Sequence, residues 1–150
     1  MKVGGARVAV VGATGLVGQE IVSLLAEREL PIRELLLYAS ERSAGSEVAF
    51  GEDGVRVQRL PPELPQVDIA FLCAGAAVDA ELADDLAAAG AVAIELSVPR
   101  GSPRPPLALV GWRESEIAAL AKGGIVAVPD PLAQLLAVPL RAIGAVVPIR

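Results

Sequence analysis

The chain of 150 residues contains no histidine and one cysteine, Cys73. A single cysteine cannot form an internal disulfide, and the lack of histidine excludes a zinc site built from Cys and His ligands. Aromatic residues make up only 3% of the chain, and the formal net charge is −5, without a basic stripe. Nucleic acid binding needs clustered Lys and Arg, so we expect neither a structural metal nor a nucleic acid partner.

Long hydrophobic runs are also missing, although hydrophobic residues make up 53% of the chain. Charged residues, proline or glycine interrupt every apolar run before it reaches the ~18 to 20 residues needed to cross a bilayer. The N-terminus leads directly into a segment that contains Arg7, without the apolar region and cleavage site of a signal peptide. We therefore expect a cytoplasmic protein that does not interact with membranes.

What the sequence does contain is a regular alternation of strand-like and helix-like segments. Apolar or alternating runs bounded by turn residues predict strands at 7–11, 34–39, 55–58, 67–73, 91–96, 107–110 and 125–128. Apolar residues spaced three and four apart, with capping signals, predict helices at 16–28, 80–89, 114–122 and 131–143.

Several side chains have an expected place on these helices. The inward face of the first helix is expected to consist of Val17, Ile21, Leu24 and Leu25. In the second helix, Leu82 and Leu86 point inward. The last helix has Asp130 as its N-cap and Pro131 at its first position, and Pro139 is expected to kink it.

Strands that alternate with helices predict a Rossmann-type doubly wound α/β fold, in which helices cover both faces of a mostly parallel sheet. No linker or repeat interrupts the chain, so we expect residues 1–150 to form a single dinucleotide-binding domain. The apolar run A-V-V-P-I near the C-terminus suits the first strand of a following domain, which would start at about 144–150. If exposed, this run would favour a homodimer or aggregation.

The segment Gly12-Ala13-Thr14-Gly15-Leu16-Val17-Gly18 connects the first strand to the first helix. Its three glycines have separate tasks: Gly12 permits a sharp turn, Gly15 permits close approach of a pyrophosphate, and Gly18 permits close packing of helix and sheet. The pyrophosphate would lie at the helix N-terminus, where free N–H groups and the helix dipole favour an anion. The alternative is an ordinary tight turn.

The end of the second strand indicates which dinucleotide is preferred. An acidic residue there would accept hydrogen bonds from the ribose 2′-hydroxyl of NAD. This sequence instead has Ser40, Arg42 and Ser43, which offer donors and a positive charge to a 2′-phosphate. NADP is therefore the predicted cofactor, with NAD as the alternative, although Glu41 is an unfavourable neighbour for a phosphate. The segment would otherwise be a solvated loop.

Four stretches together resemble the N-terminal half of the aspartate-semialdehyde dehydrogenase family. They are V-A-V-V-G-A-T-G-L-V-G-Q-E, L-L-Y-A-S-E-R-S-A-G, V-D-I-A-F-L-C-A-G and G-G-I-V-A-V-P-D, and the similarity spans most of residues 7 to 140. The resemblance implies that the glycine turn holds the NADP pyrophosphate, that the Ser-x-Arg-Ser segment reads the 2′-phosphate, and that the Ala-Gly loop lies near the nicotinamide half. The residues that inherit these roles are Gly12, Thr14, Gly15, Leu16, Val17, Ser40, Arg42, Ser43, Ala74 and Gly75.

The catalytic residues of that family do not match this chain. The family forms a thioester on a cysteine in an Asn-Pro-Asn-Cys-Ser-Thr type of stretch, and a histidine of a second domain moves the proton. The corresponding stretch here is Val-Pro-Asp-Pro-Leu-Ala, which puts Pro131 in the place of the cysteine. Since the chain also has no histidine, the resemblance implies a cofactor domain without a catalytic residue.

Three other residues have two interpretations each. Cys73 is a substitute nucleophile or, as we favour, a small buried side chain at the end of a strand. Arg100 resembles the family's phosphate- or substrate-binding arginine, but its spacing is one residue short, so it is either a ligand residue or a solvated loop residue. Trp112 is favoured as a packing residue over a stacking platform.

Four functions are consistent with these patterns to different degrees. The favoured one is an NADP-binding module from a branch of the family that lacks the nucleophile, either a pseudoenzyme or a cofactor-domain fragment. The alternative is a working aspartate-semialdehyde dehydrogenase, which acts in amino-acid biosynthesis, with its substrate domain absent from this chain. A short-chain dehydrogenase or epimerase would need Tyr-x-x-x-Lys, but Tyr38 is followed four residues later by Arg42. A scaffold that has lost cofactor binding remains the fourth.

Overall fold

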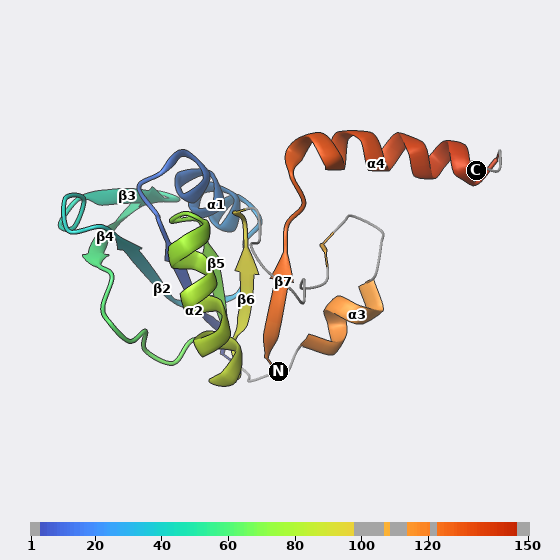
Figure 1. The fold of residues 1–150 in the computed structure, drawn as a ribbon. Coiled ribbons are helices and arrows are strands. Elements are labelled where there is room, and N and C mark those ends of the chain that lie inside the picture. Colours follow the sequence, from blue (N-terminus) through green and yellow to red (C-terminus); the bar gives the residue numbers. More distant parts are fainter. Residues whose placement is uncertain (1–3, 98–106, 109–113, 121–122, 147–150) are drawn as a thin grey trace.

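The computed structural model describes residues 4–97, 107–108, 114–120 and 123–146. The strands are β1 (Ala6–Val11), β2 (Ile32–Ala39), β3 (Glu47–Phe50), β4 (Asp53–Arg59), β5 (Ile69–Leu72), β6 (Val92–Glu95) and β7 (Gly124–Ala127). The helices are α1 (Leu16–Glu27), α2 (Ala76–Ala88), α3 (Glu114–Ala119) and α4 (Pro131–Gly144). The strands form one sheet in the order β3-β4-β2-β1-β5-β6-β7, in which every named pair is parallel except β3 with β4 (Figure 1).

The strand order reverses between β1 and β5. From β1 the chain moves outward to β2 and β4, and it then returns to the other side of β1 and moves outward again through β5, β6 and β7. This confirms the predicted doubly wound, mostly parallel fold. In such sheets the loops that leave two neighbouring strands in opposite directions open a crevice at the carboxyl ends of those strands, where ligands bind.

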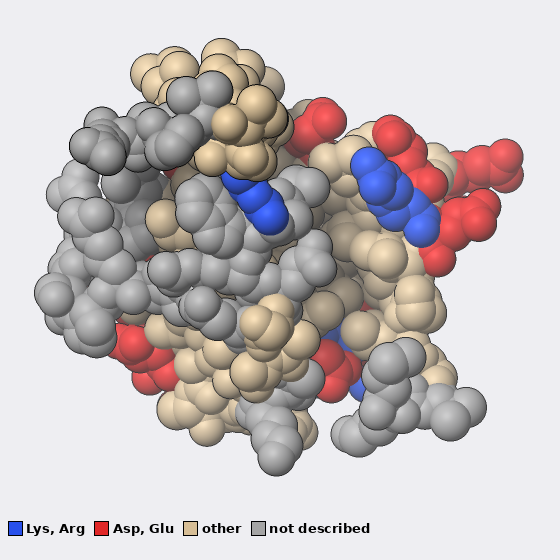
Figure 2. Space-filling model, turned by 90° about the vertical axis from the view of Figure 1, so that its right-hand side faces the viewer, with Lys and Arg blue, Asp and Glu red and all other residues tan. Residues whose placement is uncertain are grey.

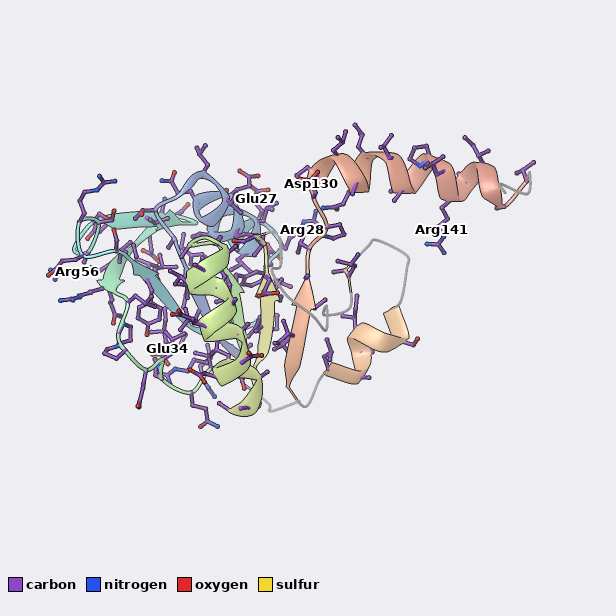
Figure 3. All side chains as sticks on the ribbon, viewed as in Figure 1. Glu27, Arg28, Glu34, Arg56, Asp130 and Arg141 are labelled. Atoms are coloured by element: carbon purple, nitrogen blue, oxygen red, sulfur yellow. The ribbon has the colours of Figure 1, made fainter. Side chains whose placement is uncertain are left out.

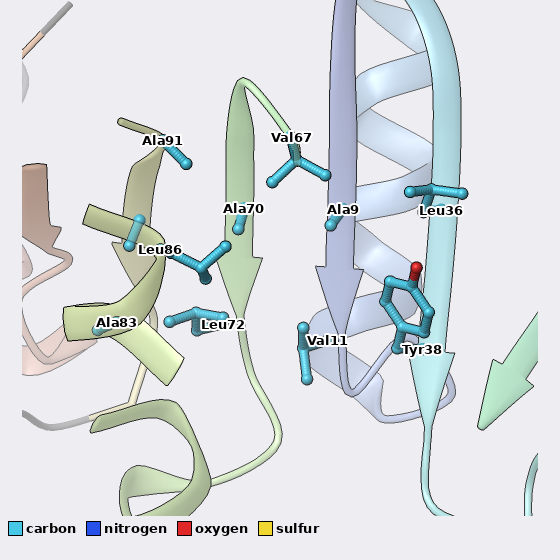
Figure 4. Close-up of a cluster of buried hydrophobic side chains, with 11 residues drawn as sticks. Ala9, Val11, Leu36, Tyr38, Val67, Ala70, Leu72, Ala83, Leu86 and Ala91 are labelled. Atoms are coloured by element: carbon cyan, nitrogen blue, oxygen red, sulfur yellow. The ribbon is translucent and has the colours of Figure 1, made fainter. Parts of the chain in front are cut away.

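Alternate side chains of each central strand pack under different helices. Val8 and Val10 of β1 lie in a buried cluster with Val22 and Leu25 of α1. On the other face, the cluster drawn in Figure 4 joins strand residues to α2, and its members are Ala9, Val11, Leu36, Tyr38, Val67, Ala70, Leu72, Ala83, Leu86, Ala91 and Ala93. This period of two explains why the central strands read as continuous apolar runs, since both of their faces are covered.

One strand was not predicted. No strand was predicted between residues 40 and 54, but this polar stretch contains β3, which pairs antiparallel with β4 through the partners Phe50 and Asp53. Only two residues connect these partners, and the first, Gly51, has a φ of +63°. Glycine adopts this conformation without strain, which suits a two-residue hairpin. Four residues with one buried side chain, Val48, are too few for a clear alternating signal.

The predicted inward face of α1 is partly wrong. The buried residues are Gly18, Val22 and Leu25, whereas Val17 is 50% exposed. The helix lies so close to the sheet that the side with Gly18, which has no side chain, is the one that faces inward. The pattern of large apolar residues therefore predicts an inward face of α1 that begins about one residue too early, at Val17 instead of Gly18.

Helix α2 begins earlier than predicted, at Ala76 instead of residue 80. Gly75 is its N-cap, with φ +118°. The added first turn contains Asp79, which is 1% exposed. Leu86 is buried as expected and Leu82 is half-buried, but Ala83 shares the inward face with them.

The C-terminal elements follow the prediction more loosely. In place of the predicted strand 107–110, Leu107 forms a single parallel bridge with Ala127, and residues 109 and 110 lie outside the described part of the chain. Helix α4 begins as predicted, because the Asp130 carboxylate accepts the N–H of Leu132 at 2.9 Å. Pro139 lies inside the helix, which continues to Gly144.

Helix α4 projects away from the sheet (Figure 1), and none of its residues is buried. Figure 3 shows Asp130 at the start of this projection and Arg141 toward its far end. Figure 2 views the side from which α4 projects, and the described basic side chains visible there lie apart from one another. Among the described residues, no helix is both long enough and apolar enough to span a membrane.

Candidate functional site

A cleft of about 310 Å³ opens at the carboxyl ends of β1, β2 and β5, where the strand order reverses. Its lining residues are Val11, Gly12, Thr14, Gly15, Ala39, Ser40, Leu60, Cys73, Ala74 and Val78. Five of them belong to the predicted cofactor site: Gly12, Thr14, Gly15, Ser40 and Ala74. The structure therefore brings together, in one cleft, residues from three separate segments of the sequence.

A larger groove of about 520 Å³ lies elsewhere, between the loop 62–67 and α2. It extends to Val67 and Ala91, which precede β5 and β6. It therefore lies toward the amino ends of these strands, and none of the predicted site residues within the described part of the chain lines it. Ligands of open parallel sheets bind beyond the carboxyl ends, so the smaller cleft is the candidate site.

The glycine turn is held tightly against both neighbouring strands. The amides of Gly12 and Ala13 donate to the carbonyl of Tyr38 at 2.8 and 3.0 Å. Gly12 has a φ of +87°, and a Cβ at this position would lie 2.5 Å from the carbonyl oxygen of Cys73. A Cβ at Gly18 would overlap the carbonyl oxygen of Gly12. Both positions therefore exclude any side chain, and the turn can lie flat against the sheet.

The N-terminus of α1 faces this cleft without a side-chain cap. Gly15 is the N-cap and has no side chain that could cap the helix, while its own amide donates to the Gly12 carbonyl at 3.0 Å. The first amides of a helix have no partner within the helix, so those of Leu16 and Val17 remain available to a ligand. Their side chains are 90% and 50% exposed, respectively. Free amides and the positive end of the helix dipole suit a phosphate group.

The segment after β2 forms a compact turn beside the cleft. The Ser40 carbonyl accepts the amides of Ser43 and Ala44 at 2.9 and 3.1 Å, and Ser40 itself lines the cleft. Arg42 and Ser43 belong to the same turn but lie outside the lining. The side chain of Glu41, the unfavourable neighbour, forms an ion pair with Arg59 at 3.2 Å. This pairing offsets a negative charge that would otherwise repel a phosphate.

Cys73 lies in the cleft wall, where its surroundings disfavour ionisation of the thiol. The Sγ donates to the carbonyl of Val11 at 3.0 Å. Burial, with a further contribution from the negative charge of Asp79, raises the pKa of the Cys73 thiol to about 12. Since the thiolate is the nucleophilic form, this environment favours the structural interpretation of Cys73.

Sequence patterns missed a polar group behind the loop that follows β5. The Asp79 carboxylate accepts the amide of Ala74 at 3.0 Å and that of Gly75 at 3.3 Å, and it also accepts the hydroxyl of Ser97. Nearby, Glu95 is buried, and burial together with the charges of Asp79 and Asp84 raises its pKa. A signal was present: Asp79 precedes the inward residues Ala83 and Leu86 by four and seven positions.

The remaining predicted residues lie outside the cleft. Pro131 occupies the first turn of α4, after β7, and does not line the cleft. Arg100 and Trp112 lie outside the described residues. Leu16, Val17, Arg42, Ser43 and Gly75 adjoin the cleft through their own turns without lining it. Among the described residues, no group of three or more His, Cys, Asp or Glu is arranged to hold a metal ion.

Most of the chain matches one known family. Residues 7–119 match the family described as semialdehyde dehydrogenase, NAD binding domain. The chain belongs to this family. The matched region covers the sheet from β1 to α3, including the glycine turn and the loop after β5. A nicotinamide dinucleotide therefore agrees with both the family and the position of the cleft.

Relatives of the semialdehyde dehydrogenase family extend beyond this chain. It is 36% identical to aspartate-semialdehyde dehydrogenase of Rickettsia conorii over 137 residues, which cover 90% of this chain and 40% of that protein. It is also similar to aspartate semialdehyde dehydrogenase II of Vibrio cholerae, solved in complex with ASA, with a TM-score of 0.86 and 36% identity over 97% of this chain and 48% of that one. The chain therefore spans less than half of the length of these relatives.

A more distant structure shares the fold. Aspartate semialdehyde dehydrogenase from Candida albicans, solved with NADP, has a TM-score of 0.70 and 23% identity, and the match covers 93% of this chain and 47% of that one. The chain thus carries the NAD binding domain of the semialdehyde dehydrogenase family and is similar to part of aspartate-semialdehyde dehydrogenases.

Proposed function

We propose that this chain binds NADP in the cleft at the ends of β1, β2 and β5, and that it does not catalyse a reaction by itself. The observation that carries the first part is the glycine turn. Gly12 and Gly18 exclude side chains, so the turn lies against the sheet and the uncapped N-terminus of α1 faces the cleft. A pyrophosphate would accept the amides of Leu16 and Val17 there.

The preference for NADP over NAD rests on the turn after β2. Ser40, Arg42 and Ser43 would surround the 2′-phosphate with two hydroxyl donors and a guanidinium fork. The acidic residue in this turn, Glu41, is paired with Arg59 and does not compete for the ribose. NAD is the alternative, since the pyrophosphate and nicotinamide parts of the two cofactors are the same.

The lack of catalysis rests on the residues available to react. NADP, when bound, supplies hydride transfer, whereas a semialdehyde dehydrogenase also needs a nucleophile and a proton carrier. Pro131 stands where the resemblance places the nucleophile, the Cys73 thiol has a raised pKa, and the chain has no histidine. The chain would then act as a pseudoenzyme or as the cofactor part of a larger protein. The alternative is a genuine aspartate-semialdehyde dehydrogenase whose substrate domain is absent from this chain.

Calorimetric titration of the purified chain with NADPH and with NADH tests the binding. We expect NADPH to bind more tightly than NADH, and Gly15→Val to abolish binding of both, because its side chain would fill the space of the pyrophosphate. Absence of binding by both cofactors at millimolar concentration would contradict the proposal and favour a scaffold.

An activity assay tests the second part. We expect no phosphate-dependent oxidation of aspartate semialdehyde by the chain with NADP. Turnover that persists in Cys73→Ala would show that another residue supplies the nucleophile, and turnover lost in Cys73→Ala would assign that role to Cys73.

A further inference from the structure

We propose that Asp79 is a positioning residue for the nicotinamide half of the dinucleotide. Together with Ser97 it holds the loop after β5 so that Ala74 and Val78 face the cleft with apolar side chains and the loop amides are not free to bind the ligand. This inference rests on the proposed function and concerns a residue outside the glycine turn.

Hydrogen bonds to the Asp79 carboxylate join three segments of the chain. One carboxylate oxygen of Asp79 accepts the Ala74 amide at 3.0 Å, and the other accepts both the Gly75 amide, at 3.3 Å, and the Ser97 hydroxyl. Asp79 belongs to the first turn of α2, whereas Ser97 follows β6. The carboxylate therefore fixes the loop between β5 and α2 to the next strand of the sheet.

Packing of α2 against the sheet would not by itself need a carboxylate at this position. Asp79 is 1% exposed, and the other buried residues on its side of α2 are Ala83 and Leu86. An apolar side chain would continue this core, whereas a buried charge has a large desolvation cost unless several donors surround it. Glu95, another buried acid nearby, adds to that cost. The hydrogen bonds of the carboxylate hold residues 74 and 75 in a fixed conformation.

The position of the loop determines which part of the ligand it meets. In doubly wound sheets the dinucleotide crosses the point where the strand order reverses, with its adenosine ribose at the end of the second strand and its pyrophosphate at the first helix. The end of β2 and the N-terminus of α1 account for these two groups. The nicotinamide half must then cross toward β5, where Ala74 and Val78 line the cleft.

Because both loop amides already donate to Asp79, this side of the cleft offers the ligand apolar contacts. Val78 is 37% exposed and lines the cleft together with Ala74 and Cys73. Such a wall suits the face of an aromatic ring and does not suit a phosphate. The structure thus separates an anion-binding side, at α1, from an apolar side, at the start of α2.

Binding of two ligands that differ only in the nicotinamide half tests this inference. NADPH contains both halves, whereas 2′,5′-ADP contains only the adenosine with its 2′-phosphate and its 5′-phosphate. For Asp79→Asn we expect NADPH affinity to fall roughly 10-fold or more, as loss of hydrogen bonds to a charged group implies. The affinity for 2′,5′-ADP should change by less than about 2-fold, which also shows that the variant is folded.

Two further variants complete the design. Ser97→Ala removes one donor but keeps the carboxylate, so a smaller loss confined to NADPH, of roughly 3-fold, is expected. Glu81→Gln removes the same charge from the exposed side of α2 and should leave both affinities unchanged. Equal losses for both ligands in Asp79→Asn and Ser97→Ala, or no loss in either variant, would overturn the positioning role. If the unaltered chain binds neither ligand, the proposed function fails, and this role fails with it.

Discussion

Gly18 of α1 lies directly against the carbonyl oxygen of Gly12, and no Cβ fits between them. The contact presses the first turn of the helix onto the turn that leaves β1. Gly18→Ala must push these two backbone segments apart, and we expect the free energy of unfolding to fall by about 1 to 3 kcal/mol, as in other overpacked sites. Urea unfolding followed by circular dichroism measures this change.

Gly54→Ala provides the matched control for this substitution. A Cβ at Gly54 would meet only the end of the flexible Glu47 side chain, at 3.1 Å. This side chain can move at little cost, so the stability should stay within about 0.5 kcal/mol of the unaltered chain. An equal loss of unfolding free energy in both variants would show that the close contact at Gly18 is not the cause of the destabilisation.

Arg42→Ala tests how the cleft distinguishes its ligands. If the guanidinium binds the 2′-phosphate, NADPH affinity should fall roughly 10-fold or more, because a charge-assisted contact is lost. NADH affinity should hardly change. Arg56→Ala is the control, because Arg56 is an exposed arginine of β4 that does not line the cleft (Figure 3). An equal loss of NADPH and NADH affinity in Arg42→Ala would contradict the assigned role.

The Cys73 thiol should react slowly while the chain is folded. Its pKa is raised from 9.0 to about 12, so at pH 8 its thiolate fraction is about 1,000-fold smaller than that of an unfolded thiol. A thiolate of higher pKa is intrinsically more nucleophilic, which offsets part of this difference, so alkylation by iodoacetamide should be slower by roughly 10- to 100-fold, and 8 M urea should restore the ordinary rate. Rapid alkylation of the folded chain would instead identify Cys73 as a reactive cysteine.

Glu95→Gln should stabilise the protein in a way that depends on pH. Burial, and then the charges of Asp79 and Asp84, raise the pKa of Glu95 above its ordinary value of 4.5. The favourable contribution of its protonated form is complete below pH 4.5 and is lost as the pH rises through the folded pKa. The variant has no such loss, so its advantage over the unaltered chain should be larger at pH 7 than at pH 4.

Urea unfolding at pH 4, 5.5 and 7 measures this advantage. Glu81→Gln serves as the control for the change in net charge, since it removes an acid from the exposed side of α2. A constant difference between Glu95→Gln and the unaltered chain across this range would show that Glu95 titrates alike in the folded and unfolded states.

Removal of residues 131–150 should leave the sheet intact. None of the α4 residues is buried, and Leu132, Leu135 and Leu136 are each more than half exposed. An exposed apolar helix promotes association, so the chain that ends at Asp130 should be less self-associated in sedimentation velocity. Its urea midpoint should stay close to that of the full chain. A large loss of stability would mean that α4 supports the folded domain.

The sequence was most informative where glycine determines the backbone. The glycine turn and the strands beside it follow from apolar runs and from three glycines in fixed positions, and the doubly wound arrangement follows from the alternation of strands with helices. The hairpin of β3 and β4 was missed because its short strand has one buried side chain and lies in a polar stretch. The start of α2 was placed too late because its first inward position holds an acid, Asp79, instead of an apolar residue, and the partner Ser97 is 18 residues away.

The hydrogen bond between Asp79 and Ser97 also bears on how the domain assembles. The side of the cleft at the glycine turn is built mainly from β1, α1 and β2, which lie close together in the sequence. The loop after β5 reaches its final conformation only when β6 has paired with β5 and delivered Ser97. During synthesis the two sides of the cleft would therefore form at different chain lengths. A chain that has emerged only as far as α2 would have the side at the glycine turn without the final conformation of the loop after β5.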